Sequence, residues 1–570
     1  MNAPVSVDAY SLPLERFDVS DPQLYQDDTW HPYFERLRRE DPIHYVPASP
    51  YGPYWAVSKY KDIMHCEVNH AVFSNEIGGI QIEDQPKDMA RPSFIRMDPP
   101  RHDDQRKVAS PIVAPANPQA RGAASVLRIT LRCAAPDVTF AKLGVDRLRF
   151  FLRDAANQAL PLYELLGAHT LSVAFADAPT DPAPVIRPAA SLRPAGFEAD
   201  DALLPWPARG FTGFRLLTEY FAFPEKFLFF DVADIDAKTL ASGGARLHIF
   251  IYLDQALPEL ERAIGPHSLA LGCVPLVNLF PLRCEPINLS HADTEYRVVP
   301  DVRSPLGKEV WSVRRVLESQ PEGSMRVWKP FHRLTETDPE PGVAGGFYHV
   351  SRRPAAPGMP GTEVFLALND PAFNPEAPSE ARLSVDALCL NRDLPADLPF
   401  GVGQRHLRLV RGAAAVNEVV CLTAPTPTLR HPLREGRFWR LVSHLSLGHL
   451  SVTGGADGAA ALKEVLRLYD LRESAETRAA IDGLIGISAA PGTARAPGRA
   501  GAFCRGLDVT LEFDPRAWRA SGLYLLTAVL ERFLALHGTI NSFTRTRAVL
   551  RGRPGVAAAW PARSGTRALT

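Results

Sequence analysis

The sequence lacks the residue patterns that mark several common classes of protein. It has 7 cysteines among 570 residues, and no two of them stand at C-x-x-C spacing. Zinc ribbons and disulfide frameworks need paired cysteines, so neither is predicted, and a reducing, cytoplasmic compartment is indicated. Lys+Arg total 63 against Asp+Glu 64. The surplus of positive charge on which nucleic-acid binders depend is therefore missing.

The sequence also has no long hydrophobic run. The opening MNAPVSVDAYSLPLE has neither a basic nor an apolar region of the kind that signal peptides carry, so no signal peptide is expected. The most apolar stretch, Ser268–Leu282, contains Pro275 and Pro281 and is too short to span a bilayer. We interpret it as a buried strand region and expect no direct insertion into a membrane.

Motifs for catalysis or metal binding are scarce as well. Neither Gly-x-Ser-x-Gly nor a phosphate-binding G-x-x-x-x-G-K-[ST] string occurs. His444 and His449 are five residues apart, which places them about 140° apart around a helix rather than on one face. His248 and the pair His291 and Asp293 have no evident third ligand. No catalytic residue, no metal site and no cofactor is predicted.

The first 118 residues have a distinct pattern. Trp30–Glu40 has helical spacing, Ile43–Val46 and Tyr54–Val57 predict a hairpin, and Ser58 is predicted to cap a helix over Lys59–Val68. The strings Pro53–Glu76 and Phe94–Pro115 resemble the N-terminal portion of bacterial cytochromes of the P-450 type, particularly the alkane-hydroxylating group. That resemblance implies that His102 and Arg106 match positions that contact haem propionates.

The remainder of such a monooxygenase is missing. Its haem iron needs a cysteine thiolate, which the family presents in a loop of the form F-x-x-G-x-x-x-C-x-G. In the nearest string, which begins at Phe400, Leu407 stands where the cysteine belongs and Leu409 where the second glycine belongs. We therefore expect His102 and Arg106 to be orphaned, and we place a join between two unrelated pieces near Pro115–Pro118.

The second piece mixes strand and helix patterns. Alternating or β-branched runs predict strands, whereas apolar residues at helical spacing predict helices, and Pro/Gly-rich runs predict loops. The predicted strands are Val126–Cys133, Asp146–Arg153, Thr170–Ala176, Lys226–Val232, Ala245–Asp254 and Asp508–Phe513. The predicted helices are Ala155–Leu166, Phe214–Phe221, Arg437–Leu447, Ala459–Leu468 and Gly522–Ser542. The predicted loops are Pro300–Pro305, Pro339–Pro360 and a flexible, exposed Ala489–Gly501.

The helix predicted over Gly522–Ser542 has the strongest pattern. Its apolar residues form one stripe, made of Leu523, Leu526, Leu530, Phe533, Leu534 and Ile540. Fully burying one such side chain is worth roughly 1.5–3 kcal/mol. The stripe therefore requires a partner, either within its own domain or in another subunit.

Several long strings of the second piece, in order, resemble the type VI secretion baseplate family TssF, also called VasA or ImpG. They are Gly210–Val232, Asn278–Pro305, Asn391–Gly401, Leu422–Val452, Phe503–Asp514 and Ser521–Thr544. The resemblance covers most of residues 119–570. The family opens with a helical region and a β segment that this chain lacks, because the monooxygenase-like piece stands in their place.

The resemblance implies a non-enzymatic, structural protein. The expected fold class is multidomain α+β, with β-rich domains, short helices, a helical C-terminal element and an N-terminal fragment of a mostly helical monooxygenase fold. The expected regions are 1–118, 119–300, 301–430 and 431–570. The expected partners are TssG, TssK and TssE, with a second TssF copy as a further possibility.

Candidate residues for an interface or the core follow from the same strings. They are Phe214, Phe227, Phe229, Trp439, Leu526 and Phe533. Two alternatives stay open at this point. One is a haem-thiolate monooxygenase with an appended region, and the other is a chimeric or mis-predicted gene product.

Overall fold

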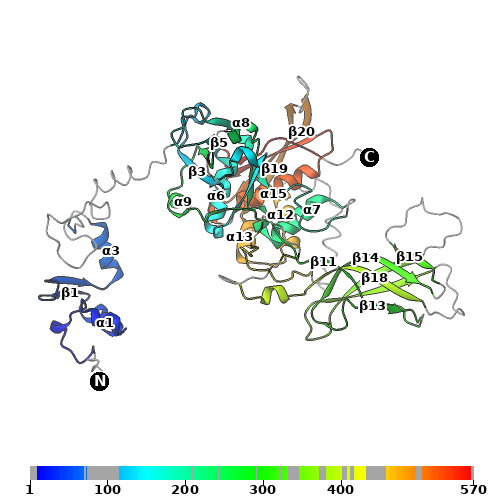
Figure 1. Ribbon diagram of the computed structural model, residues 1–570, viewed down its shortest axis with the longest axis horizontal. Helices are drawn as coiled ribbons and strands as arrows, with labels where there is room; N and C mark the ends of the chain where they lie inside the picture. Colours follow the sequence, from blue (N-terminus) through cyan, green and yellow to red (C-terminus); the bar gives the residue numbers. More distant parts are fainter. Residues whose placement is uncertain are drawn as a thin grey trace. The chain divides into compact units, whose positions relative to one another are not determined.

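The computed structural model divides the chain into two compact units, Met1–Val113 and Ala114–Thr570 (Figure 1). Each unit is described by itself. The structure describes residues 9–69, 72–73, 114–135, 137–207, 210–241, 243–290, 292–320, 323–331, 346–370, 381–400, 407, 409–410, 416, 418–431, 457–495, 503–520 and 522–565. The unit boundary lies close to the predicted join at Pro115–Pro118.

The first unit is a small α+β fold around one apolar cluster. Its elements are η1 (Leu14–Arg16), α1 (Pro22–Gln26), α2 (His31–Glu40), β1 (Ile43–Val46), β2 (Tyr54–Val57) and α3 (Tyr60–Val68). The predicted helix over Trp30–Glu40 and the predicted hairpin are confirmed. The predicted cap is wrong: Lys59 is the N-cap residue of α3, and the Ser58 hydroxyl donates to the Pro42 carbonyl instead.

One face of the β1–β2 hairpin is apolar and uncovered. Tyr45 lies opposite Trp55 in the register, with ring centroids 4.7 Å apart. Ile43, Tyr45 and Trp55 are 49%, 46% and 62% exposed. The other face packs Ala56 against Phe17 and Leu37. A two-stranded sheet with one exposed face buries little apolar surface, so the described part of this unit has little to stabilise it by itself.

The second unit begins with two four-stranded sheets. One has the order β3-β9-β5-β6 and the other β10-β4-β8-β7. The strands are β3 (Ser125–Arg132), β4 (Leu148–Leu152), β5 (Thr170–Ala176), β6 (Val185–Pro188), β7 (Leu192–Ala195), β8 (Phe229–Val232), β9 (Arg246–Leu253) and β10 (Leu269–Leu271). The helical elements are η3 (Pro118–Ala120), α5 (Phe140–Leu143), α6 (Ala156–Ala168), η4 (Ala189–Ser191), α7 (Thr212–Ala222), η5 (Pro224–Phe227), α8 (Ala237–Ala241) and α9 (Pro258–Ala263).

Two predictions in this region need correction. Lys226–Val232 was expected to be one strand, but it starts as the 3-10 turn η5 and becomes a strand only at Phe229. Ser268–Leu282 was expected to be a buried strand region. It is instead two short strands, β10 and β11, joined by an open segment in which Val274 and Leu276 are 71% and 62% exposed. Composition alone indicated burial there, and the fold leaves those side chains uncovered.

The helix α15 (Leu523–Leu536) lies at the centre of the larger unit's core. It packs against α6, α7, α14 (Pro515–Ala520) and β21 (Phe543–Leu550). The predicted stripe is correct for Leu523, Leu526, Leu530, Phe533 and Leu534, which are all buried. It is wrong for Ile540, which is 59% exposed and lies beyond the end of the helix. The helix is buried on all sides rather than on one stripe, so its partner lies within its own chain.

The C-terminal part forms a five-stranded sheet with the order β19-β20-β21-β22, and β23 also pairs with β21. Its remaining elements are α12 (Gly458–Tyr469), α13 (Ala475–Gly483), β19 (Leu484–Arg495), β20 (Phe503–Phe513), β22 (Ala558–Ala559) and β23 (Arg563–Ser564). The flexible loop predicted at Ala489–Gly501 is wrong up to Arg495, because Ala489–Arg495 is paired with β20. The helix predicted at Arg437–Leu447 lies outside the described residues.

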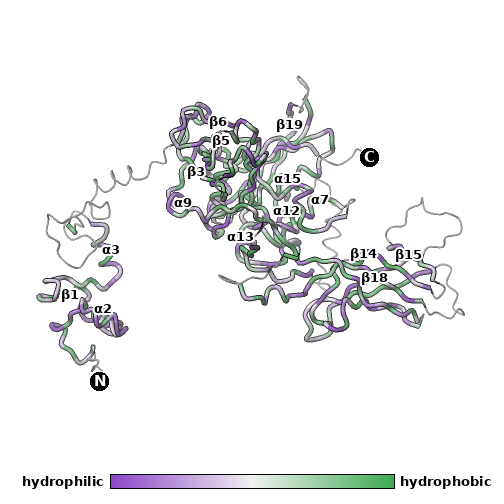
Figure 2. Tube along the Cα trace, viewed as in Figure 1, coloured by the Kyte–Doolittle hydropathy of each residue, from purple (hydrophilic) through white to green (hydrophobic). Residues whose placement is uncertain are grey.

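Residues in the middle of the chain form an eight-stranded sheet with its own apolar core. Its strands are β11 (Phe280–Arg283), β12 (Ile287–Asn288), β13 (Tyr296–Val298), β14 (Glu309–Ser319), β15 (Met325–Pro330), β16 (Phe347–Pro354), β17 (Thr362–Asn369) and β18 (Arg382–Leu390), followed by η7 (Leu394–Asp397). Buried and less buried residues alternate along β17 and the first part of β18, and Figure 2 shows the hydropathy of each residue along the chain. The loop predicted at Pro339–Pro360 is wrong over Phe347–Pro354, which is the strand β16.

The cores show which parts of the second unit depend on each other. One continuous cluster joins residues of β3 to α9 with residues of α12 to β22. The eight-stranded sheet has a separate cluster. The multidomain α+β fold class is confirmed, whereas the four-region division stays a prediction. In the part of the chain that the structure describes, no helix is both long and apolar enough to cross a membrane.

Candidate functional site

The structure places most of the predicted interface or core residues inside the chain. Phe227, Phe229, Leu526 and Phe533 are 0%, 5%, 0% and 2% exposed. Phe214 is half-buried. Trp439, His102, Arg106, His291, His444 and His449 lie outside the described residues. Phe214 is therefore the candidate among the described residues that retains contact surface.

Phe214 belongs to an aromatic cluster that links three helices. The cluster consists of Phe211 and Phe214 at the start of α7, Tyr469 at the end of α12, and Phe533 and His537 at the end of α15. Phe214 stacks on Tyr469 with ring centroids 5.9 Å apart and planes 8° apart. Phe211 lies 4.3 Å from His537, edge to face. Such pairs add about 0.5–1.5 kcal/mol beyond the area that they bury.

The α12 end of this cluster is fixed by hydrogen bonds. The Thr477 hydroxyl donates to the Asp470 carboxylate at 2.6 Å, and the backbone N–H of Glu473 donates to the same carboxylate at 3.1 Å. Ser474 caps α13 by accepting from the Thr477 N–H. Burial raises the pKa of the Tyr469 hydroxyl above its ordinary value. The aromatic rings are thus held in place and half open to solvent at Phe211, Phe214 and His537.

Beneath α7 lies a buried charge network centred on Glu219. The Glu219 carboxylate accepts from the backbone N–H groups of Leu203 and Leu204, each at 2.8 Å, and from the Lys226 ammonium. Glu219 is 1% and Lys226 1% exposed. Burial lowers the pKa of the Lys226 amine, and the neighbouring Glu219 charge opposes that shift. The network fastens the loop after β7 to α7 and η5.

Gly196 is required where this loop turns away from β7. Its φ is +97°, and a Cβ there would lie 2.7 Å from the Lys226 carbonyl oxygen. Its N–H donates to Asp201 at 3.0 Å, and Asp201 and Asp231 both accept from Arg149. Its hydrogen bonds to the Asp231 carboxylate, and then to Asp201, raise the pKa of the Arg149 guanidinium.

A second network contacts the same loop at Phe197. The Arg532 guanidinium lies 3.6 Å from the centroid of the Phe197 ring. Glu531, which is fully buried, accepts from Arg563 at 2.8 Å and from Arg532 at 3.3 Å. Cation–π and ion-pair contacts of this kind hold α15 to the loop and to β23. These buried charges therefore serve packing between segments that are far apart in the sequence.

The eight-stranded sheet contains a small hollow of about 20 Å³, lined in part by charged residues. Those charges are already engaged. Arg297 bonds Glu363 at 2.6 Å, and Lys308 bonds Asp301 at 2.6 Å. The buried Glu309 accepts from Arg430 at 2.8 Å. Because these charged groups are paired within the chain, the hollow offers little with which to bind or transform a ligand.

No arrangement for metal or haem chemistry forms in the residues that the structure covers. Within these ranges, no three His, Cys, Asp or Glu side chains are grouped so as to hold a metal ion. The Nδ1 atom of His248 lies 2.9 Å from the Thr130 hydroxyl, a single polar contact. Leu407, which stands at the haem-loop cysteine position, is 40% exposed. The geometry defines a multidomain protein whose buried polar groups are used to tie segments together.

Comparisons with known proteins agree with this description. Residues 103–567 match the sequence model of the family described as "Type VI secretion system, TssF". The chain is 37% identical over 455 residues to the type VI secretion system component TssF1 of Pseudomonas aeruginosa, covering 77% of this chain and 72% of that protein. The chain therefore belongs to the TssF family of the type VI secretion system.

Two further likenesses concern the fold and the front piece. A chain from a cryo-electron microscopy structure of a TssK–TssF–TssG baseplate subcomplex shares the fold, with a TM-score of 0.59 at 23% identity, over 78% of this chain and 79% of that one. The chain is also 35% identical over 113 residues to linalool 8-monooxygenase of Pseudomonas putida. That match covers 18% of this chain and 28% of the enzyme. The expected resemblances of both pieces are thus confirmed.

Proposed function

We propose that this chain is a structural subunit of a type VI secretion baseplate and that it assembles with TssG and TssK. The observation that carries the proposal is the 37% identity over 455 residues to a type VI secretion component. The fold shared with a chain of a TssK–TssF–TssG subcomplex supports the same partners. TssE and a second TssF copy stay predictions.

The mechanism of such a subunit is packing. Its buried ion pairs and shared core stiffen the part of the larger unit outside the eight-stranded sheet, because the networks at α7 and α15 join segments that are distant in the sequence. Its half-open aromatic cluster at Phe211, Phe214 and His537 supplies amphipathic contact area, which interfaces favour. A cytoplasmic location and the absence of catalysis are part of this proposal.

Co-expression with TssG is expected to give one stable complex. The chain and TssG should elute together in size-exclusion chromatography at about 0.1 M and about 0.5 M salt, since apolar packing is little screened by ions. A chain carrying only residues 119–570 is the matched control. It should retain TssG equally, because the front unit has its own separate cluster. Separate elution of the full chain and TssG at every salt concentration would contradict the proposal.

The competing function is that of a haem-thiolate monooxygenase with an appended region. The 35% identity of 113 residues to a monooxygenase favours it, but the chain covers only 28% of that enzyme. We expect a reduced, CO-treated sample to show no Soret band at the thiolate-ligated position, because Leu407 offers no sulfur ligand. An intact monooxygenase treated in parallel is the control. A thiolate-type band that titrates with added haem would establish the enzyme instead.

The join itself has a separate test. A join that is an artefact of gene prediction or assembly would have no transcript that crosses Pro115–Pro118, whereas a genuine chimeric gene would have one. Sequencing of such a transcript distinguishes the two.

A further inference from the structure

The sheet β3-β9-β5-β6 has an outer face that is covered only in part. Its inner face packs into the main core through residues such as Ile129 and Ile249. Side chains alternate between the faces, so the register places Val126, Arg128, Thr130 and Arg132 of β3 on the outer face. Their partners on β9 are Tyr252, Phe250, His248 and Arg246, in the same order.

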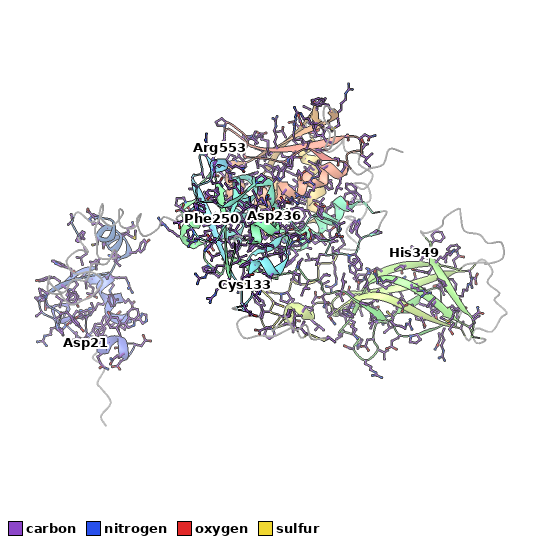
Figure 3. The ribbon with its side chains drawn as sticks, turned by 45° about the horizontal axis from the view of Figure 1, so that its top comes forward. Asp21, Cys133, Asp236, Phe250, His349 and Arg553 are labelled. Atoms are coloured by element: carbon purple, nitrogen blue, oxygen red, sulfur yellow. The ribbon has the colours of Figure 1, made fainter. Side chains whose placement is uncertain are left out.

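The segment that follows the unit boundary covers one end of this outer face. The Tyr252 hydroxyl donates to the Pro115 carbonyl at 2.6 Å, and the Asn117 amide donates to the Ser172 hydroxyl at 2.8 Å. Ala120, Ala174 and Phe250 form a small buried cluster there. Phe250, labelled in Figure 3, is completely buried. Residues of the same chain therefore cover this end of the face.

The other end of the face carries positive charge, and no segment within the described ranges is seen to cover it in this way. Arg128, Arg132 and Arg246 are exposed, and none of the three has an ion pair or a side-chain hydrogen bond within the described ranges. His248 lies between them in the register. We call Arg128, Arg132, Arg246 and His248 the basic face. The Asp177 carboxylate, just after β5, acts on His248 in the opposite direction to Arg128 and Arg246 and raises its pKa.

The stability of the chain alone does not account for the basic face. Arg132 is directly opposite Arg246 in the antiparallel register, and like charges in that position destabilise a sheet. Burial and the two neighbouring arginines Arg128 and Arg246 lower the pKa of His248. Charges on an edge strand protect it from unwanted pairing, which would explain Arg128 and Arg132 on β3. That reason does not apply to Arg246 and His248, because β9 has a neighbouring strand on both sides.

We propose that the basic face binds a carboxylate-rich segment of a protein partner in the secretion assembly. The planar guanidinium pairs with carboxylates through two parallel hydrogen bonds, and three unpaired forks on one flat face suit such a segment. Arg128 and Arg132 are four residues apart on β3, about 13 Å along a strand. An extended segment with acidic residues on the same side matches this spacing. Nucleic acid is less suited, because the chain as a whole has a net charge of −1. The inference rests on the proposed function for the identity of the assembly.

The decisive experiment compares charge reversal with a matched control in the full chain. The test variant is Arg132→Glu with Arg246→Glu. The control is Arg495→Glu with Arg505→Glu, two exposed arginines on the neighbouring strands β19 and β20. Each chain is co-expressed with TssG and TssK, and the retained partners are quantified at about 0.1 M and about 0.5 M salt. The test variant should retain a partner about tenfold less tightly at low salt, and the control should match the unchanged chain.

A neutral variant separates binding from folding. Arg132→Gln removes the repulsion with Arg246, so the isolated chain should unfold at the same or a higher temperature while partner retention falls. A purely structural role predicts the opposite, a lower unfolding temperature with retention unchanged. Arg132→Lys, which keeps the charge but not the fork, should retain partners at an intermediate level.

Competition experiments with the same variants test the alternatives to a protein segment, which are nucleic acid and a lipid surface. Poly-glutamate peptide should displace the partner from the unchanged chain. It should have no such effect on the test variant, which lacks two of the arginines of the basic face. If duplex DNA or anionic phospholipid vesicles discriminate between the two chains and poly-glutamate does not, the inference is overturned. Equal retention by all variants overturns the inference alone. Failure of the unchanged chain to retain any partner overturns the proposed function, and this inference with it.

Discussion

Replacing Lys226 with methionine is expected to destabilise the larger unit by about 3–5 kcal/mol, because it leaves the Glu219 charge buried without its cation. Glu219 is 1% exposed, and its further partners among the described residues are Leu203 N–H, Leu204 N–H and the more distant Arg215. The shift in the midpoint of urea unfolding, followed by tryptophan fluorescence, measures the effect. The loop after β7 should become susceptible to protease at the same time.

Two further variants show whether the loss of stability comes from the unpaired Glu219 charge or from lost packing. Lys238→Met on α8 removes an exposed lysine and should change the midpoint very little. Lys226→Met combined with Glu219→Gln removes both charges and should recover much of the loss, since a neutral pair leaves no uncompensated ion. If the double variant is as unstable as Lys226→Met alone, the loss comes from packing and the ion-pair explanation is wrong.

Residues 119–300 expressed alone are expected to be insoluble. Their core is completed by α15, which packs on α6 and α7, and the Trp518 indole donates to Glu164 at 2.7 Å across a separation of 354 residues. Without these contacts the fragment exposes the apolar faces that α15 covers, and such patches cause aggregation. The soluble fraction after expression, with and without co-expressed residues 431–570, measures the effect.

The middle of the chain provides the comparison. Residues 278–431 contain the eight-stranded sheet with its own core, and Arg430 closes onto Glu309 within that range. This fragment should be soluble and give a cooperative unfolding transition. Soluble, cooperatively unfolding material from 119–300 alone would show that the shared core is dispensable and would support the four-region division predicted from the sequence.

Much of the secondary structure was predictable because its signal is local. The alternation in β3, β5 and β9 and the helical spacing in α2, α7 and α12 are each contained in one short stretch. The errors occur where distant residues decide. Lys226 is in a 3-10 turn rather than a strand since its side chain reaches Glu219 on α7. Val274 and Leu276 are exposed because no segment of the described chain covers them.

The candidate site was predictable only in part. Aromatic content and order singled out Phe214, Phe227, Phe229 and Phe533, but no local pattern separates a ring that is buried within the chain from one that remains half open. Tyr469 and His537 were missed because their role depends on three helices meeting. The basic face was missed for the same reason, as Arg132 and Arg246 are far apart in the sequence.

The sequence by itself determined many of the strands and helices, which family the long second piece resembles, and that the nearest haem-loop string lacks its cysteine. These follow from spacing and residue type, which short-range sterics and chemistry read directly. Only the tertiary structure decided that α15 is enclosed on every side, that Glu219 and Lys226 share one buried site, and that Arg132 faces Arg246. Those outcomes depend on the register and packing of segments up to hundreds of residues apart, and local periodicity carries no information about which distant surfaces meet.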